Sequence, residues 1–375
     1  MTSPLSSLKI IEMVGLGPAP LAGQLLADMG AEVIVIDRKS GDDISQEVNR
    51  RGKQSIALNL KAPEGIKTAL RLIERADILI EGFRPGVMER LGLGPDKCLN
   101  TNPKLVYARM TGWGQTGPLS HSAGHDLNYL AITGALHAMG KDGEPPIPPL
   151  NLVADYGGGS MFLIMGILCA IIERSISGKG QVIDAAMCDG VPAMMGMIHS
   201  MLAQDTWVNQ REDNFVDGGA PYYRCYTCAD GKYLSVGCIE PQFFAEFLEL
   251  TELNSDLSAK QNNKTYWPEL HDLFEQTISA KSRDEWASIF EGTDACVAPV
   301  LDFEEAATYS HNIERNAFFT QNDVTQTSPA PRFSRSETPV PKAAQKTGQE
   351  AETVLKAAGF SETEIKKLAT DNILL

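Results

Sequence analysis

The first third of the chain alternates short apolar runs with longer segments in which apolar residues recur every three or four positions. The short runs predict strands, at Leu8 to Glu12, Glu32 to Asp37, Asp77 to Gly82 and Leu105 to Met110. The longer segments predict helices, from Pro20 to Met29 and from Lys61 to Ala76. Strands that alternate with helices predict an α/β fold, in which a doubly wound parallel sheet has helices on both faces.

A long apolar helix is predicted from Tyr156 to Arg174, with Asp155 immediately before it. Aspartate is a preferred N-cap residue, because the helix N-terminus stabilises its charged form. Glycines 157–159 form the first turn, and each costs about 0.5–1 kcal/mol relative to alanine, which indicates that another helix or a ligand packs there. The apolar run Met161 to Ile172 is shorter than the ~20 residues that span a membrane, so we expect a buried helix and no membrane span.

The pattern changes from about Tyr222, where short alternating strands such as Lys232 to Val236 precede mixed helices up to about Ile289. This change predicts a second, smaller domain of α+β type. After Pro299 the chain is rich in proline, serine and threonine, and a short helix is predicted near its end, from Gln349 to Ala358.

The composition narrows the choice of partners. The 375 residues include 33 Lys and Arg against 48 Asp and Glu, a net charge of −15. Nucleic acids and anionic membranes need basic surfaces, so neither is an expected main partner, whereas a few arginines can bind a small anionic ligand. Seven scattered cysteines and no apparent signal peptide indicate free thiols in a reducing compartment. We expect a cytoplasmic location in a prokaryote, and a peroxisomal or mitochondrial one is open in a eukaryote.

Three short motifs point to chemistry that their surroundings do not support. Residues 112–117 (GWGQTG) match the dinucleotide-binding fingerprint, but Pro118 and a polar loop follow where a helix should begin. Cys225 and Cys228 lack a second pair at a metal-binding spacing. His121 and His125 are four residues apart but lack the acidic residue of a metalloprotease helix. No metal site is therefore predicted.

Other polar residues are better candidates for a site. His125 lies in a polar loop that leads into a helix, a usual place for reactive side chains. Four basic residues lie at or near the ends of predicted elements: Arg38, Lys61, Arg84 and Arg90. They are either surface charges or a phosphate site, because ligands of parallel sheets bind beyond the carboxyl ends of the strands. The methionines between residues 187 and 201 are either core filler or an adaptable surface for an acyl chain.

Taken together, these segments resemble the α-methylacyl-CoA racemases, within family III of the CoA transferases. The similarity extends over almost the whole chain and depends on several motifs in the same order. They are residues 15–20 (GLGPAP), 26–33 (LADMGAEV), 51–55 (RGKQS), 58–61 (LNLK), 124–129 (GHDLNY), 149–155 (PLNLVAD), 178–181 (GKGQ), 239–243 (IEPQF) and 294–300 (DACVAPV). The chain departs from the family pattern at Asn59, where we expect aspartate in relatives, and at Cys225 and Cys228.

The resemblance implies an interlocked homodimer. Its large, doubly wound domain would comprise residues 1–200, completed by residues 325–375 from the other end of the chain. A small domain would comprise residues 220–315, with linkers at 200–220 and 315–330. Each active site would lie between the large domain of one subunit and the small domain of the other.

The resemblance also implies roles for individual residues. His125, supported by Glu240, and Asp155 would be the two catalytic bases. CoA would be held by Arg38 and by two segments of the chain, with two further arginines as phosphate ligands. The first segment is Leu58, Asn59, Leu60 and Lys61, and the second contributes Gly124, Asp126, Leu127, Asn128 and Tyr129. The two further arginines are Arg84 and Arg90.

The implied reaction inverts the α-carbon of a 2-methylacyl-CoA by moving its proton through an enolate, with one base on each face. Such a transfer needs no metal or separate cofactor, since CoA is part of the substrate. We expect the first helical turn after Asp155 to supply an N–H donor for the enolate oxygen. The alternatives are a CoA transferase in which Asp155 attacks the acyl-CoA, and a CoA-binding protein without catalytic activity. The pairing of His125 with Glu240, and the lack of a glycine-rich flap in the small domain, favour the racemase.

Overall fold

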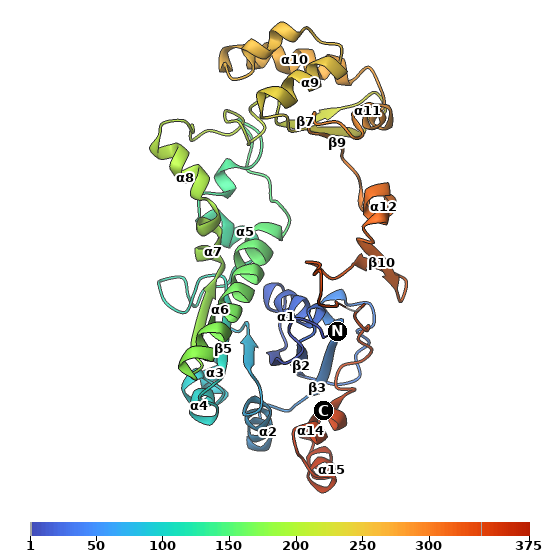
Figure 1. Cartoon of the computed structure of the whole chain (residues 1–375). Helices are drawn as coiled ribbons and strands as arrows, with labels where there is room; N and C mark the ends of the chain where they lie inside the picture. Colours follow the sequence, from blue (N-terminus) through green and yellow to red (C-terminus); the bar gives the residue numbers. More distant parts are fainter. Residues whose placement is uncertain (1, 339) are drawn as a thin grey trace. The chain divides into compact units, whose positions relative to one another are not determined.

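The computed structural model describes residues 2–338 and 340–375 and contains a six-stranded parallel sheet (Figure 1). The strands lie in the order β3-β2-β1-β4-β5-β6, with these bounds: β1 Lys9–Met13, β2 Glu32–Asp37, β3 Lys53–Ala57, β4 Ile78–Glu81, β5 Val106–Thr111 and β6 Val182–Ala186. The predicted α/β class with a parallel sheet is confirmed. The sequence pattern missed β3 (KQSIA) and β6 (VIDAA), because polar and small residues interrupt their apolar runs.

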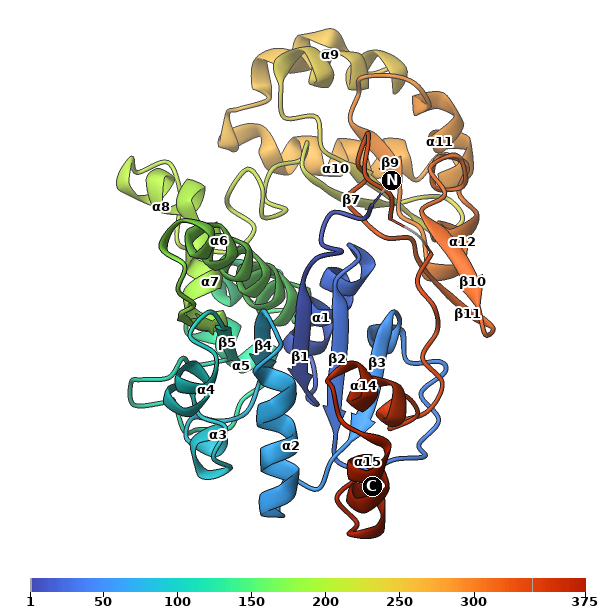
Figure 2. The same ribbon diagram turned by 60° about the horizontal axis from the view of Figure 1, so that its bottom comes forward.

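Helices cover both faces of this sheet (Figure 2). On one face, alternate strand residues such as Ile11 and Ile36 share a core with α2 (Pro63–Ile73), α14 (Ala351–Ala357) and α15 (Glu362–Thr370). Helices α1 (Pro18–Asp28) and α6 (Phe162–Ser177) pack on strands from the opposite side. The terminal helix predicted from Gln349 to Ala358 is thus present as α14.

The sequence pattern missed α15, although its start carries a recognisable signal. The Ser361 hydroxyl accepts the backbone N–H of Glu364, and the Glu364 carboxylate in turn accepts the backbone N–H of Ser361. This reciprocal pair is a capping box, which can be found from serine followed three residues later by glutamate.

The long apolar helix begins earlier than predicted. A π-helical segment, Leu152–Met161, precedes α6, so Asp155 lies inside the helix and does not cap it. The prediction that Asp155 is the N-cap is therefore wrong. The carboxylate of Asp126, far away in sequence, accepts the N–H groups of Ala154 and Asp155 at 3.0 Å and 2.7 Å. Because this side chain satisfies donors of the first turn, the helix does not need a local cap there.

The glycine run in this segment allows other helices to approach closely. A Cβ on Gly158 would lie 2.8 Å from Val191 Cγ2 and 2.9 Å from the Val191 backbone nitrogen, in α7 (Met187–Met194). A Cβ on Gly159 would lie 3.2 Å from Pro18 Cβ, at the start of α1. Of the two explanations for the glycines, a helix or a ligand, helix packing is the one observed.

Helix α6 is not buried within the single chain, contrary to the prediction. Leu163, Ile167 and Ala170 are buried, but Ile172 and Ile176 are 65% and 85% exposed. The prediction rested on the length of the apolar run, which does not specify how much of the helix surface the rest of the chain covers. Residues Leu152–Ser177 are long and apolar enough to cross a membrane by length and composition alone, two criteria that core helices of soluble proteins also meet.

The chain divides into two compact units. The larger comprises Met1–Thr133, Leu150–Met194 and His311–Leu375, and the smaller comprises Gly134–Pro149 and Met195–Ser310. The larger unit also contains these short elements: α3 Val87–Arg90, α4 Pro95–Thr101, α5 Asp126–Ala131, β10 Phe318–Gln321 and β11 Val324–Thr327. Helix α13, Ser310–Glu314, spans the boundary.

The smaller unit has its own sheet and its own core. Three antiparallel strands, β7 Arg224–Thr227, β8 Tyr233–Val236 and β9 Val297–Pro299, lie in that order. Its helices are α8 Gly196–Ala203, α9 Pro241–Leu250, α10 Trp267–Ile278, α11 Arg283–Phe290 and α12 Phe303–Thr308. Buried aromatic rings dominate the core, including Phe244, Phe247, Phe274 and Trp286.

Candidate active site

Two cavities lie at the carboxyl edge of the parallel sheet, where the strand order changes direction between β1 and β4. Ligands of open α/β sheets bind in the crevice at such a point. The first cavity, of about 580 Å³, is lined by residues that include Arg38, Arg84, Gly124, His125, Asn128 and Tyr129. The second, of about 690 Å³, is lined by residues that include Arg38, Leu58, Asn59, Leu60 and Lys61. The structure thus places most of the predicted site residues at one edge of the sheet.

The backbone around His125 is fixed by local hydrogen bonds. His125 is the N-cap of α5, and its N–H donates to Asn128 Oδ1 at 3.1 Å. The Tyr129 hydroxyl donates to the Gly124 carbonyl, and a Cβ on Gly124 would lie 2.7 Å from the Tyr129 ring. Glycine is therefore required at position 124, and the exposed His125 side chain lies at the cavity wall.

Asp155 occupies an environment that favours its protonated form. Its side chain is partly buried, and Asp155 Oδ2 lies 3.4 Å from the position that a Cβ on Gly17 would take. Burial raises the pKa of Asp155, and the negative charge of Asp126 raises it further. A hydrogen bond from Asn151 and the charge of His125 act in the opposite direction and lower this pKa. A carboxylate with a raised pKa is a stronger base, and its protonated form remains available at higher pH.

The two predicted bases lie close enough for their charges to interact. His125 comes from the start of α5 and Asp155 from the π-helical segment, 30 residues later, yet the charge of His125 acts on the Asp155 carboxyl. Asp155 also raises the pKa of Tyr129, in addition to the larger effect of burial, and Arg84 lowers it. Arg84, His125 and Tyr129 line the first cavity, whereas Asp155 lines neither cavity and is linked to His125 and Tyr129 only through these charge effects.

Some predicted site residues do not face these cavities. Arg90 lies on α3 beside Gly86, and its side chain lines neither cavity. Asp126 is buried and bonds the first turn of the long helix, and Leu127 lines neither cavity. Glu240 is the exposed N-cap residue of α9 in the smaller unit.

The structure removes the reason for expecting an N–H donor to the enolate oxygen in the turn after Asp155. It assumed that a helix begins just after Asp155, but the helix begins at Leu152. The N–H groups of Ala154 and Asp155, within its first turn, already donate to Asp126.

Aromatic residues that the sequence pattern did not single out also form the site. Phe83 lines both cavities, and the Arg38 guanidinium lies 5.6 Å from the centre of its ring. Trp113 lines the first cavity and packs edge-on against Tyr129, with ring centres 4.8 Å apart. Both follow a predicted strand within a few residues, and this position at the carboxyl end of a parallel strand is the signal that could have identified them.

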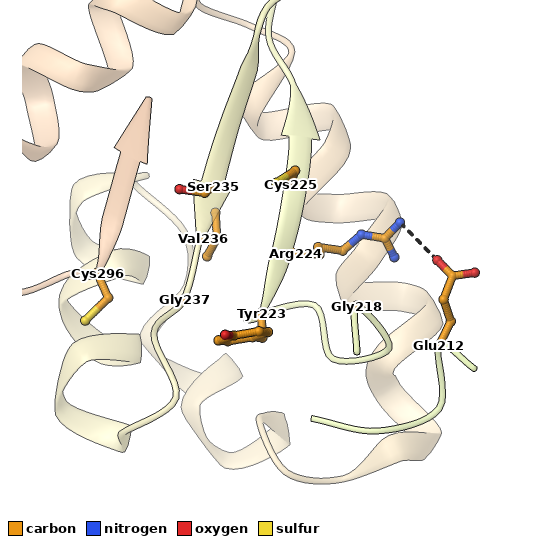
Figure 3. Close-up of a pocket in the computed structure, with 9 residues that line it drawn as sticks. All are labelled: Glu212, Gly218, Tyr223, Arg224, Cys225, Ser235, Val236, Gly237 and Cys296. Atoms are coloured by element: carbon orange, nitrogen blue, oxygen red, sulfur yellow. Dashed lines mark ion pairs between the residues drawn. The ribbon is translucent and has the colours of Figure 1, made fainter. Parts of the chain in front are cut away.

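The smaller unit contains a cavity of its own, of about 530 Å³ (Figure 3). Tyr223 and Cys296 are among its lining residues, and an ion pair of 3.8 Å joins Arg224 to Glu212. The pKa of Cys296 is raised by burial and also by the charge of Glu240, so Glu240 lies near this cavity.

The CxxC motif of the smaller unit does not form a ligand pair. Cys225 is exposed and Cys228 is buried. Within residues 2–338 and 340–375, no group of three or more histidine, cysteine or acidic side chains is arranged to hold a metal ion.

Comparison with known proteins adds independent information. The family model described as CoA-transferase family III matches residues 5–351. α-Methylacyl-CoA racemase of Mus musculus is 44% identical over 372 residues, which cover 99% of this chain and 97% of that protein. The Homo sapiens racemase is 41% identical over 375 residues, with coverage of 99% and 97%. Succinyl-CoA:glutarate CoA-transferase of Mus musculus is 27% identical, with coverage of 99% and 90%.

Solved structures show the same fold. A CAIB/BAIF family protein from Brucella suis superimposes with a TM-score of 0.80 at 23% identity, and the match covers 96% of this chain and 100% of that one. Rv3272 from M. tuberculosis gives a TM-score of 0.76 at 24% identity, with coverage of 94% and 99%.

Proposed function

The chain belongs to family III of the CoA-transferases, and we propose that it inverts the α-carbon of 2-methylacyl-CoA thioesters. The family match confirms the resemblance predicted from the sequence motifs. Two relatives above 40% identity over almost the full chain are α-methylacyl-CoA racemases, which supports an isomerase. The observation that carries the proposal is electrostatic: the charge of His125, which lines the first cavity at the ligand-binding edge of the sheet, acts on Asp155, an aspartate whose pKa is raised.

The proposed reaction moves one proton at a time. A base on one face takes the α-hydrogen, and the electron pair of the broken C–H bond moves into the thioester as an enolate. An acid on the opposite face then donates a proton to the same carbon, which inverts it. With one substrate enantiomer His125 is the base and Asp155 the acid, and with the other enantiomer they exchange roles. The raised pKa of Asp155 favours this exchange, because both of its protonation states are used.

The two cavities support a proposal for CoA binding. Arg38 is shared by both, Arg84 lines the first, and Lys61 lines the second. These cations would pair with the phosphates, and the backbone from Leu58 to Lys61 would border the rest of the nucleotide. No metal or separate cofactor is proposed, since CoA enters with the substrate.

We also propose that the active form is an interlocked homodimer in which Glu240 of a second copy orients His125. Two features of the single chain support this proposal. Glu240 is exposed in the smaller unit, and α6 has exposed apolar residues such as Ile172 and Ile176 that a second copy would cover.

Incubation of one enantiomer of a 2-methylacyl-CoA in D₂O tests the reaction. The wild-type chain should lose the optical purity of the substrate and introduce deuterium at the α-carbon. Asp155→Asn and His125→Gln should each slow inversion by at least ~10²-fold, a usual effect of losing one general acid–base group. Each variant should still exchange the α-hydrogen of the one enantiomer that faces its remaining base.

Two additions to this incubation, a free carboxylic acid and hydroxylamine, separate the racemase from the transferase. A transferase would move CoA to an added carboxylic acid, and hydroxylamine would trap an acyl group on Asp155. Transfer of CoA without α-deuterium would overturn the proposed racemase.

A further inference from the structure

A buried carboxylate lies at the carboxyl end of β4, beneath the two cavities. Glu81 is 0% exposed and lines neither cavity. Its Oε2 accepts the backbone N–H of Phe83 at 2.8 Å, and its Oε1 accepts Arg109 Nε at 2.9 Å. Arg109 in turn donates from both Nη atoms to Glu89 on α3, at 2.9 Å and 3.4 Å. Glu81 therefore joins the loop after β4 to a charge network on β5 and α3.

The bond to Phe83 fixes the part of this loop that faces the cavities. Phe83 lines both of them, and its ring lies 5.6 Å from the Arg38 guanidinium. Arg38 is exposed, and an exposed arginine loses side-chain entropy when it binds a ligand unless a neighbour restricts it beforehand. The Phe83 ring can restrict Arg38 in this way, because a cation is attracted to the face of an aromatic ring.

We propose that Glu81 is a positioning residue for CoA: it holds Phe83 by the backbone, and the Phe83 ring holds Arg38 ready for the nucleotide. This inference rests on the proposed function, because it assumes that CoA binds at Arg38. Glu81 has no contact with the reacting atoms, so its loss should weaken CoA binding and leave the proton-transfer steps unchanged.

The charge of Glu81 provides a way to measure this role. Burial raises the pKa of Glu81 to about 7, against the opposing effects of the Phe83 N–H and Arg109. Arg109 and the Tyr107 phenol on β5 and Glu89 on α3 are the titratable groups that face it. Protonation turns one acceptor oxygen into a donor, so the bonds to Phe83 and Arg109 weaken as the pH falls through about 7. Affinity for CoA should fall over the same range.

The test compares Glu81→Gln with Glu89→Gln as a matched control. Both variants remove one negative charge from a partner of Arg109, but Glu89 has no bond to Phe83. The control therefore measures the effect of a lost charge and weakened bonds at Arg109 while the bond to Phe83 stays intact. Binding of free CoA, measured by calorimetry, should weaken about tenfold in Glu81→Gln and less than twofold in Glu89→Gln at about pH 8. The KM for acyl-CoA should rise by the same factor as the Kd, and kcat should stay within about twofold.

The pH dependence of CoA affinity is a second measurement, and it would not differ between the two chains if Glu81 only stabilised the fold. Between about pH 8 and pH 6 the CoA affinity of the wild type should fall several-fold more than that of Glu81→Gln, in which this titration is absent. Equal pH dependence of the two chains, or equal effects of the two substitutions, would overturn the inference.

A second comparison requires no change at Glu81, so it applies even if Glu81→Gln fails to fold. In Arg38→Ala, the arginine that Phe83 is proposed to hold for CoA is missing, so Glu81 can no longer influence CoA binding by this route. The extra loss of CoA affinity between about pH 8 and pH 6 should therefore be absent from Arg38→Ala, and its persistence there would refute the inference. A wild-type chain that binds CoA but does not exchange α-deuterium would instead refute the proposed racemase and leave the positioning of CoA intact.

Discussion

Asp126 has two roles in the structure, and two substitutions separate them. Its Oδ2 accepts the N–H groups of Ala154 and Asp155, and its negative charge raises the pKa of Asp155. Asp126→Asn removes the charge but keeps an acceptor oxygen of the same size. Asp126→Ala removes both.

The hydrogen bonds determine the expected loss of stability. A hydrogen bond to a charged group contributes about 1.5–3 kcal/mol and one between neutral groups about 0.5–1.5 kcal/mol, so weakening both bonds in Asp126→Asn should cost about 2 kcal/mol. Asp126→Ala leaves two donors of the first turn without a partner, at about 1–3 kcal/mol each, and should cost about 4 kcal/mol. Urea denaturation measures both free energies of unfolding, and equal losses would contradict the idea that the retained amide oxygen still accepts these N–H groups.

The charge determines the expected change in the pH profile. Because the carboxylate of Asp126 raises the pKa of Asp155, Asp126→Asn should lower it. For the enantiomer on which Asp155 acts as the base, Asp155 must be ionised, so the acidic limb of kcat/KM should move to lower pH. For the other enantiomer Asp155 must be protonated and His125 neutral, but this form of the site carries the same total number of protons, so its profile has the same two limbs and the same acidic limb should move to lower pH.

A carboxylate elsewhere in the larger unit is a suitable control. Asp184 accepts the N–H of Gln115 at 2.9 Å and is not among the groups that shift the pKa of Asp155. Asp184→Asn should leave both limbs where they are. If Asp126→Asn moved either limb to higher pH, or moved neither, Asp126 would not be setting the proton affinity of the proposed base.

Three further predictions follow from packing, assembly and chemistry. Gly158→Ala should destabilise the fold by about 1–3 kcal/mol in thermal unfolding, because its Cβ would meet the Val191 backbone, whereas Gly196→Ala, with nothing within 4 Å, should not. Mixed and refolded Asp155→Ala and Glu240→Ala chains should regain about a quarter of wild-type racemisation if each site uses two subunits, and no recovery would refute the interlocked dimer. EDTA should leave racemisation unchanged, and a loss restored by added metal would contradict the two-base mechanism.

The sequence alone predicted the main elements and the kind of chemistry. Strands β1, β2, β4 and β5 appeared as short apolar runs, because a strand buried on both faces of a parallel sheet needs apolar residues at nearly every position. The ordered motifs predicted the family and selected His125 and Asp155. Such signals are local, since each depends on residues within one element.

The tertiary structure decided what depends on residues remote in sequence. The start of the long helix could not be predicted, because the acceptor for its first N–H groups is Asp126, 28 and 29 residues away. The raised pKa of Asp155 is equally non-local, because burial and the charges of Asp126 and His125 act on it only after folding. In the sequence Glu81 is one residue of a predicted strand, and only its contacts with Phe83 and Arg109 reveal that the end of this strand supports the site. Local pattern specifies which residues form an element, whereas burial and charge act through space and require the folded chain.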